Sequence, residues 1–424
     1  QEKELLVRDF IISNIKEVMI KYGFQYLETP SFEYSDSIGK FLPDKERPDE
    51  GVFSFRDENK WLSLRYDLTA PLARYVAKNF LEIPKPFKRY QLGTVWRNEK
   101  PGPGRFREFL QFDADFVGTK SLQADAELCV MISEILENCG LTKSEYIIKI
   151  SSRKITEELF KKININENQQ KLTALRALDK IDRLGWDGVK ELLGAGRKDK
   201  SGDFTKGANL KSEDIEVIEK TLKKKSPETE DLVEILKIFK DYNFTNFEFD
   251  PSIVRGLEYY TGVIFEVNLK FDVKNKKGQV IQFGSIGGGG RYDNLVNNFG
   301  NYDAPATGIS IGLDRLVYAL MQKKEFKIKQ SKPVVICVFD KNSMKEYINV
   351  QTTLRKAGIS AEIYPGESKL KKQMEYANKI KSPAVILYGE DEIKLGKPTL
   401  RNLSSGKEQS IKIKELVNEI KKII

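Results

Sequence analysis

The sequence predicts an α+β fold, with helices flanking an antiparallel sheet, a helical insertion and a C-terminal α/β domain. Through the first 150 residues, strand-like segments recur with few of the helical crossovers that parallel strands require, which favours antiparallel pairing. Residues 160–245 are instead polar, rich in Lys and Glu, and helical in period. From 332 onward, strand-like and helix-like segments alternate, which is typical of a parallel sheet. The early strand-like segments are 61–66, 87–95, 109–117 and 146–150.

The chain begins with an amphipathic helix that Gly23 ends, and the short strand FQYLETP follows it. Strand signals return at 260–269 and 279–284, ahead of the glycine-rich stretch GSIGGGGRYDNL. The segment 307–321 has the pattern of a strand, a glycine turn and a helix. The apolar positions of the first helix are Leu5, Phe10, Ile11, Ile15, Val18 and Met19.

These changes in sequence pattern divide the chain into domains. Several domains are expected, because 424 residues are more than a single hydrophobic core usually contains. The predicted sheet domain comprises 1–159 and 246–322, and the helical insertion 160–245 separates its two pieces. A charged, weakly periodic stretch at 323–331 is the predicted linker. The α/β domain occupies 332–424.

The composition excludes several kinds of chemistry. The chain contains no histidine, which rules out Ser-His and Cys-His nucleophiles and imidazole-metal sites. Cys129, Cys139 and Cys337 are too few and too far apart for a disulfide framework or a zinc site, so we expect no metal centre. The longest apolar run, PVVICVF, is too short to cross a bilayer, and the N-terminus lacks an export signal. We therefore expect a cytoplasmic protein with no membrane partner.

The positive charge is concentrated near the C-terminus. The net charge is +9, and residues 332–424 contain 18 Lys and Arg against 11 Asp and Glu, or +7. A basic domain of this kind suits a polyanion such as nucleic acid. Alternatively, a generally lysine-rich composition with no role in binding would give the same net charge.

The stretch RNEKPGPGRFREFLQFDADF (97–116) places basic side chains around a Pro-Gly hinge and then alternates apolar with polar residues. Because a strand has period two, Gln111, Asp113 and Asp115 share one face. One interpretation is a solvated edge strand. The other is a sheet floor with a polar face toward a ligand, entered through a cationic loop. The basic residues are Arg97, Lys100, Arg105 and Arg107.

Two further positions combine a structural with a functional interpretation. Asp67 and Thr69 lie at the end of a predicted strand, just before a predicted helix. They are interpreted either as a helix cap or as ligands for an ammonium group. Arg315 falls in the first turn of a helix after a glycine, where it is either an exposed helical side chain or part of a phosphate site.

Two other motifs differ in specificity: RGLEYYTGVIFEV is the more specific, and the glycine cluster alone is a weak signal. RGLEYYTGVIFEV (255–267) places Arg255 and Glu258 in apolar surroundings, where unpaired charge is costly, although a structural role remains open. The four glycines 287–290 fit a tight turn or a close approach of the backbone to a ligand. The chain contains no G-x-x-x-x-G-K-[ST] phosphate loop.

Taken together, these segments resemble the class II aminoacyl-tRNA synthetases, and within them the histidyl-tRNA synthetase family. YGFQYLETPSFE resembles motif 1, FKRYQLGTVWRNEKPGPGRFREFLQFDADF motif 2 and ATGISIGLDRL motif 3. RGLEYYTG and GGGGRYDNL are similar to the two stretches particular to the histidine enzyme. The resemblance covers nearly the whole chain, and its C-terminal part is similar to the family's anticodon-binding module.

The resemblance implies a set of oxyanion ligands. Arg97 would bind the α-phosphate of ATP and the carboxylate of the amino acid, and Arg255 would lie at the α-phosphate, so both are candidate catalytic residues. Arg105 is implied as a further phosphate contact, and Arg315 would hold the γ-phosphate. The guanidinium group suits bidentate binding of oxyanions.

The resemblance also implies the ligands of histidine. Asp67, Thr69 and Gln111 correspond to the family's ligands of the α-amino group. Asp115 would face the imidazole, and Tyr259 and Tyr260 would close the pocket around it.

The implied reaction is that of a histidine–tRNA ligase. L-histidine and ATP give histidyl-adenylate and pyrophosphate, and transfer to the 3′ end of tRNA(His) releases AMP. Positioned arginines and Mg²⁺ can stabilise the charge on phosphate oxygens, so no protein nucleophile or histidine is required. Motif 1 implies a homodimer, and the 98–108 loop would meet the acceptor end of the tRNA.

Two other functions are weighed against this one. A non-catalytic, synthetase-like regulatory subunit of histidine biosynthesis would generally lack the anticodon module and lose pocket residues. Here that module is present, and Arg97, Gln111, Arg255, Tyr260 and Arg315 are all in place. A class II synthetase for another amino acid is disfavoured by RGLEYYTG.

Overall fold

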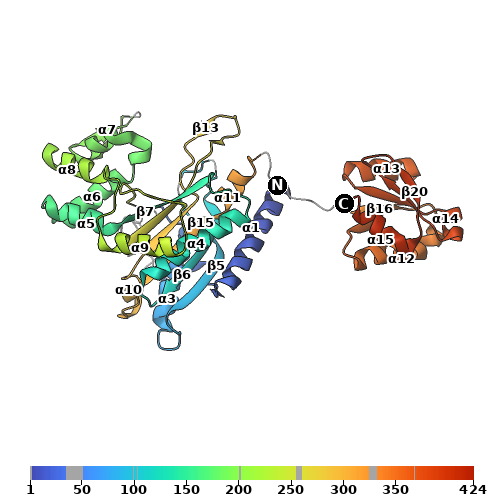
Figure 1. Ribbon diagram of the computed structural model, residues 1–424, viewed down its shortest axis with the longest axis horizontal. Helices are drawn as coiled ribbons and strands as arrows, with labels where there is room; N and C mark the ends of the chain where they lie inside the picture. Colours follow the sequence, from blue (N-terminus) through green and yellow to red (C-terminus); the bar gives the residue numbers. More distant parts are fainter. Residues whose placement is uncertain are drawn as a thin grey trace. The chain divides into compact units, whose positions relative to one another are not determined.

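The computed structural model of the chain forms two compact units, Gln1–Phe326 and Lys327–Ile424, each described here by itself (Figure 1). The structure describes residues 2–34, 51–98, 100–102, 104–199, 202–254, 260–323, 332–366 and 368–424.

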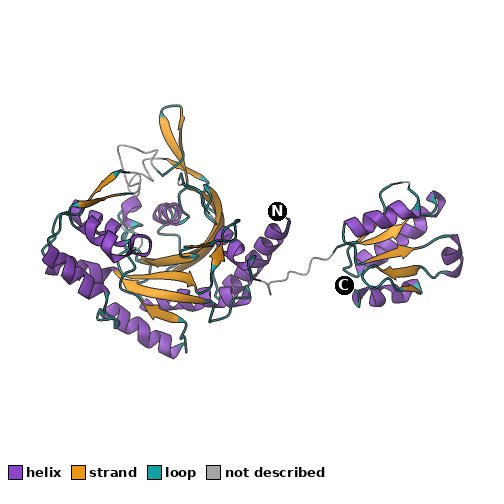
Figure 2. Ribbon diagram, turned by 90° about the horizontal axis from the view of Figure 1, so that it is seen from above, coloured by secondary structure: helices purple, strands orange, loops and turns teal. Residues whose placement is uncertain are grey.

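A large curved sheet forms the centre of the first unit (Figure 2). Among the described residues it has eight strands, and all neighbouring pairs are antiparallel except the pair at each edge. The predicted α+β class with a mainly antiparallel sheet is confirmed. In order across the sheet the strands are β1 (Gln25–Tyr26), β5 (Phe87–Trp96), β6 (Glu108–Val117), β15 (Ala306–Gly312), β14 (Gly287–Arg291), β11 (Val263–Leu269), β7 (Tyr146–Ser152) and β10 (Phe247–Phe249).

A layer of helices covers one face of this sheet. Helix α1 (Glu2–Lys21) packs against α4 (Leu122–Asn138) and α11 (Leu313–Leu320), and α4 packs in turn against α9 (Glu230–Asp241). The apolar face of β6 lies under this layer, because Phe116 on β6 meets Phe24, just after α1, edge to face at 5.2 Å. The polar face of β6 is therefore turned away from these helices.

The periodicity of the first helix predicted most of its buried side. Ile11, Ile15, Val18 and Met19 are buried as expected. Leu5 and Phe10 were included in the apolar stripe, but they are 47% and 36% exposed. Val7, rather than either of them, completes the buried face.

Smaller elements surround the large sheet. Helix α3 (Thr69–Lys78) packs against the short α10 (Asn297–Gly300), and α5 (Arg153–Lys162) packs against β7. A three-stranded sheet has the order β2 (Phe32–Tyr34), β4 (Lys60–Leu64) and β3 (Ser54–Asp57). A hairpin pairs β12 (Val273–Lys274) with β13 (Val280–Ile281).

The segment between β7 and β11 has an apolar core of its own. Leu175, Leu178, Val189 and Leu193 are among its buried side chains, and Trp186 packs against it. Its helices supply most of this core, which agrees with the helical period of the sequence. The boundaries 160 and 245 stay a prediction. The further elements here are α6 (Asn168–Leu178), α7 (Ile181–Leu193), β8 (Gly196–Lys198), β9 (Phe204–Lys206) and α8 (Ser212–Leu222).

The second unit has a mixed rather than a parallel sheet. Strand β16 (Val334–Cys337) pairs in parallel with β17 (Ala361–Ile363) and β18 (Ala384–Leu387), as the βαβ pattern predicts. Strands β19 (Thr399–Asn402) and β20 (Glu408–Ser410) extend it antiparallel, which the expectation of a parallel sheet missed. The helices are η1 (Lys341–Ser343), α12 (Met344–Lys356), α13 (Leu370–Lys379), α14 (Glu390–Leu395) and α15 (Ile413–Lys421).

Candidate active site

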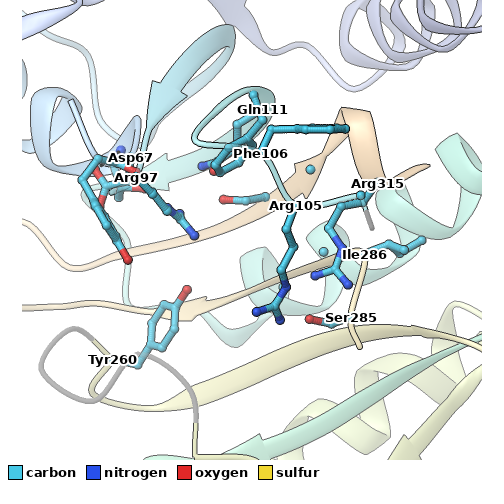
Figure 3. A pocket seen from close by; sticks show the side chains of 17 residues that line it. Asp67, Arg97, Arg105, Phe106, Gln111, Tyr260, Ser285, Ile286 and Arg315 are labelled. Carbon is cyan, nitrogen blue, oxygen red and sulfur yellow. Dashed lines mark hydrogen bonds between the residues drawn. The ribbon is translucent and has the colours of Figure 1, made fainter. Parts of the chain in front are cut away.

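A cavity of about 440 Å³ lies on the polar face of the large sheet (Figure 3). Of the ten site residues predicted from the sequence, Arg255 and Tyr259 lie outside the described residues, and Asp115 is not in the cavity wall. The other seven line the cavity, although the chain separates them by up to 248 positions: Asp67, Thr69, Arg97, Arg105, Gln111, Tyr260 and Arg315.

Arg97 follows the last residue of β5 and is held between aromatic rings. Its guanidinium lies 4.5 Å from the ring centre of Tyr66 and 5.2 Å from that of Phe109. Its Nε donates to the Tyr66 carbonyl oxygen at 3.2 Å. Since stacking occupies the faces of the group, its remaining N–H edge is the part that can bind an oxyanion in the cavity.

Two more arginines converge near the loop that precedes β14. A Cβ atom added to Gly284 would lie 3.5 Å from Nη2 of Arg315 and 3.9 Å from Nη2 of Arg105. Figure 3 shows both guanidinium groups near Ser285, apart from Asp67, Arg97 and Tyr260. Arg315 also lies over the Phe283 ring at 4.6 Å. This end of the cavity is cationic and suits a polyphosphate.

The helix that carries Arg315 is anchored to the motif 2 strand. Asp314 accepts a hydrogen bond from the Leu110 backbone N–H at 2.8 Å, which ties the first turn of α11 to β6. Gly312 precedes this helix and lines the cavity. Arg315 is half-buried in the cavity wall, so the interpretation as a merely exposed helical arginine is wrong.

Asp67 acts as a helix cap and also lines the cavity. Its Oδ1 accepts from the backbone N–H groups of Thr69 at 3.1 Å and Ala70 at 2.9 Å, at the start of α3. The two interpretations of this residue are therefore compatible. The cap fixes the carboxylate at the edge of the cavity, beside Arg97 and apart from Arg105 and Arg315.

The polar face of β6 is buried, so the interpretation of this segment as a solvated edge strand is wrong. Strand β6 lies between β5 and β15. Gln111, Asp113 and Asp115 are 5%, 1% and 2% exposed, and of the three only Gln111 lines the cavity. The face is a sheet floor whose polar groups bond to one another and to side chains of neighbouring elements.

The structure does not bring Asp115 to the cavity with the other predicted ligands. Its Oδ1 accepts from the Tyr292 hydroxyl, and its Oδ2 lies 3.3 Å from Nε of the fully buried Arg89. Burial raises the pKa of Asp115 to about 7, against the opposing effect of Arg89. Gly308 packs directly on the carboxylate, since an added Cβ would meet Oδ1 at 2.0 Å.

The glycine run forms a strand rather than a tight turn. Gly287–Arg291 is β14, paired on both sides with β11 and β15. Gly287 and Gly288 line the cavity, so the run brings bare backbone to its floor. The turn interpretation is wrong, and the expectation of a close backbone approach to a ligand stays open.

Several wall residues had no signal in the sequence. Tyr66, Phe106, Phe109, Ser285 and Ile286 belong to loops and strand ends that only the fold assembles. Ser310 lies opposite Asp113 in the β6–β15 register, a pairing that no local pattern specifies.

Comparison with known proteins identifies the family. The family model described as histidyl-tRNA synthetase matches residues 3–316, and an anticodon-binding domain model matches 332–423. The chain belongs to the histidyl-tRNA synthetase family. The resemblance stated from the motifs is therefore confirmed.

Individual relatives span nearly the whole chain. This chain is 46% identical to the histidine–tRNA ligase of Bartonella quintana, and the match covers 97% of this chain and 89% of the relative. This chain is 45% identical to the histidine–tRNA ligase of Rhizobium meliloti, and the match covers 96% of this chain and 87% of the relative. The histidyl-tRNA synthetase of Nostoc sp. PCC 7120 superposes with a TM-score of 0.79 at 27% identity, covering 99% of this chain and 96% of that one.

Proposed function

We propose that this cavity activates L-histidine with ATP and that the enzyme transfers the histidyl group to tRNA(His). The observation that carries the proposal is a single cavity with Arg105 and Arg315 at one end and Asp67, Thr69 and Gln111 at the other, where Arg97 lies beside Asp67. One end suits a triphosphate and the other an ammonium group. The cavity volume of about 440 Å³ lies within the range of pockets that bind small molecules.

The arginines would stabilise the transition state of adenylate formation. The histidine carboxylate attacks the α-phosphorus in line, and pyrophosphate leaves. Arg97 would bind the α-phosphate and the attacking carboxylate, while Arg105 and Arg315 hold the departing end of the triphosphate. These fixed charges require no reorganisation as negative charge develops on the phosphate oxygens. Arg255 is proposed for the α-phosphate on the family pattern alone.

The other end of the cavity would hold histidine. Asp67, Thr69 and Gln111 offer oxygen acceptors for the α-ammonium, and Tyr260 faces them across the cavity (Figure 3). We retain Tyr259 and Asp115 as proposed determinants of imidazole binding. Asp115 would act from beneath the wall, by setting the charge of the buried cluster with Arg89 and Tyr292.

Mg²⁺ would enter with the nucleotide. The described residues contain no group of three or more Cys, Asp or Glu side chains placed to hold a metal ion. Mg²⁺ commonly binds through substrate phosphates with only one or two protein carboxylates. The ion would neutralise phosphate charge in concert with the arginines.

The second unit is the proposed site of anticodon binding. It matches an anticodon-binding model and contains most of the excess positive charge of the chain. Such charge favours the phosphate backbone of tRNA. In the described part of the chain, no helix has the length and hydrophobicity needed to cross a membrane. We propose that the enzyme acts in the cytoplasm, where its tRNA substrate is used.

ATP–pyrophosphate exchange tests the proposal directly. Purified protein is assayed with each standard amino acid in turn, and we expect exchange with L-histidine alone. A side chain that cannot pair with the buried polar groups of the pocket would leave them without hydrogen bonds. Histidylation of tRNA(His) transcript is the second measurement. Exchange with a different amino acid, or with none, would contradict the proposal.

A regulatory subunit is the alternative that this assay excludes. The chain shares the fold of an ATP phosphoribosyltransferase regulatory subunit/histidyl-tRNA synthetase from Bacillus halodurans, with a TM-score of 0.66 at 22% identity over 90% of this chain and 93% of that one. At that identity the likeness concerns the fold alone. The cationic end of the cavity favours the enzyme, since histidine sensing needs no triphosphate site.

We also propose that the chain forms a homodimer through the three-stranded sheet. Phe32, Tyr34 and Phe55 are 53%, 46% and 44% exposed, and they project from one face because the register aligns them with Leu62 and Leu64. Phe32 and Phe55 meet at 6.4 Å. An exposed aromatic face in the motif 1 region is suited to burial against a second copy.

Replacing Tyr34 and Phe55 together with aspartate is expected to convert the dimer to monomers. Two buried charges without partners would destabilise the interface in addition to the loss of apolar contact. Sedimentation equilibrium of both proteins measures the change. Leu81→Asp is the matched control, because Leu81 is 87% exposed outside this sheet. A double variant that remains dimeric would place the interface elsewhere.

A further inference from the structure

The buried carboxylate of Asp113 interacts with three side chains that line the histidine end of the cavity. Gln111 Nε2 donates to Oδ1 at 2.8 Å, and the Thr69 hydroxyl donates to Oδ2 at 3.2 Å. Ser310 lies opposite Asp113 in the β6–β15 register, and its side chain lowers the pKa of this carboxylate in the manner of a hydrogen-bond donor. Asp113 itself is 1% exposed and lies behind the wall.

These bonds determine which atoms the wall offers to a ligand. A hydroxyl or a carboxamide can act as donor or acceptor, depending on how it is turned. An ionised carboxylate can only accept, so it takes the hydroxyl protons of Thr69 and Ser310 and the amide N–H of Gln111. Lone pairs on two hydroxyl oxygens and on Gln111 Oε1 remain for the cavity. Three acceptors match the three N–H donors of an ammonium group.

We propose that Asp113 is a positioning residue that turns Thr69, Gln111 and Ser310 into acceptors and so makes this end of the cavity selective for the α-ammonium group of the amino acid. Asp113 contacts no substrate in this arrangement and acts through the three side chains. The inference rests on the proposed function, because that function identifies which end of the cavity binds histidine.

The charge state of Asp113 is linked to what the cavity holds. Burial raises the pKa of Asp113, whereas the charge of Arg89 and the bonds from Gln111 and Ser310 lower it. An ammonium group bound over the three acceptors adds positive charge on the open side. It therefore favours the ionised carboxylate that the three hydrogen bonds require.

The competing explanation is that Asp113 merely stabilises the sheet as a counter-ion of Arg89. Asp113→Asn separates the two, because the amide has nearly the same shape but presents an NH₂ group. That NH₂ group needs an acceptor among Thr69, Gln111 and Ser310. The side chain that accepts this bond no longer donates to residue 113, so its own proton turns toward the cavity. A donor facing the ammonium is unfavourable.

Two probes of the full-length protein isolate this effect. L-histidinol carries the imidazole and the ammonium, whereas 3-(imidazol-4-yl)propionate carries the imidazole and the carboxylate without the ammonium. Binding of each is measured by calorimetry, and the KM values for histidine and ATP are measured by pyrophosphate exchange. In D113N, affinity for histidinol relative to imidazolepropionate should fall about tenfold or more. The KM for histidine should rise while that for ATP stays near the wild-type value.

Control variants separate this role from general destabilisation. Asp231→Asn removes another buried carboxylate, which accepts from the Ser152 hydroxyl outside the cavity, and should leave the affinity ratio unchanged. Asp113→Ser also removes the charge but leaves room for a water molecule, and it is prepared in case D113N does not fold. Both Asp113 variants carry the same expectation.

The outcomes are distinct for the two proposals. An unchanged ratio in a folded Asp113 variant, or an equal loss of both probes, would overturn the role of Asp113 while histidine-dependent exchange by the wild type still stands. Absence of that exchange in the wild type would refute the proposed function instead. A selective loss of histidinol binding supports the positioning role.

Discussion

Replacing Arg97 with alanine is expected to lower kcat/KM for ATP–pyrophosphate exchange by about 10²–10³-fold, the range found when one fixed donor to a developing oxyanion is removed. Arg97 is held by the Tyr66 carbonyl and by two aromatic rings, so its orientation is set before any ligand binds. Most of the loss should appear in kcat, because the contact strengthens as charge develops. Arg97→Lys should recover only part of it, since an ammonium group lacks the planar fork.

A matched control for this prediction lies in the same loop. Arg107 is exposed and does not line the cavity, so Arg107→Ala should exchange pyrophosphate at close to the wild-type rate. The two variants carry the same change of charge. Equal losses in both would show that overall charge, and not the placement of Arg97, governs the reaction. Thermal unfolding of both variants should remain near that of the wild type.

Gly289→Ala is expected to destabilise the first unit by more than about 3 kcal/mol or to prevent its folding. A Cβ at this position would lie 2.0 Å from the Gly308 carbonyl oxygen and 2.6 Å from Cα of Ile309. Both atoms belong to the backbone of β15, which is paired with β14 and β6. The clash is relieved only by breaking the ladder that forms the cavity floor.

Urea unfolding followed by circular dichroism measures this effect. Gly102→Ala serves as the control, because an added Cβ there meets no atom within 4 Å. We expect its unfolding midpoint to match that of the wild type. A Gly289→Ala protein with a midpoint equally close to the wild type would show that the sheet can separate at β14 without cost.

Local sequence patterns identified most of the strands, and the domain boundary before 332 stays a prediction. Strand β5 and strand β6 were expected at 87–95 and 109–117, and they occupy Phe87–Trp96 and Glu108–Val117. Period-two and period-3.6 patterns are properties of single elements, so no tertiary information is needed to read them. The antiparallel β19 and β20 were missed because pairing partners are not encoded locally.

The candidate site was likewise predicted only in part from the sequence. The sequence by itself determined which residue types were available: arginines for oxyanions, acceptors for an ammonium, and no histidine at all. Its motifs also indicated the family, because each motif is a continuous stretch of the chain. Seven of the ten predicted residues do line the cavity.

Only the tertiary structure decided which face of β6 meets the cavity and how far along the strand that contact extends. Gln111, Asp113 and Asp115 are equivalent in a period-two pattern, yet Gln111 lines the wall, Asp113 lies just behind it, and Asp115 is enclosed with Arg89 and Tyr292. The difference arises because α3, β5, β15 and the residue after β14, most of them distant from β6 in the chain, supply the groups that cover each position. Burial and charge pairing are properties of assembled surfaces, and no single segment contains them.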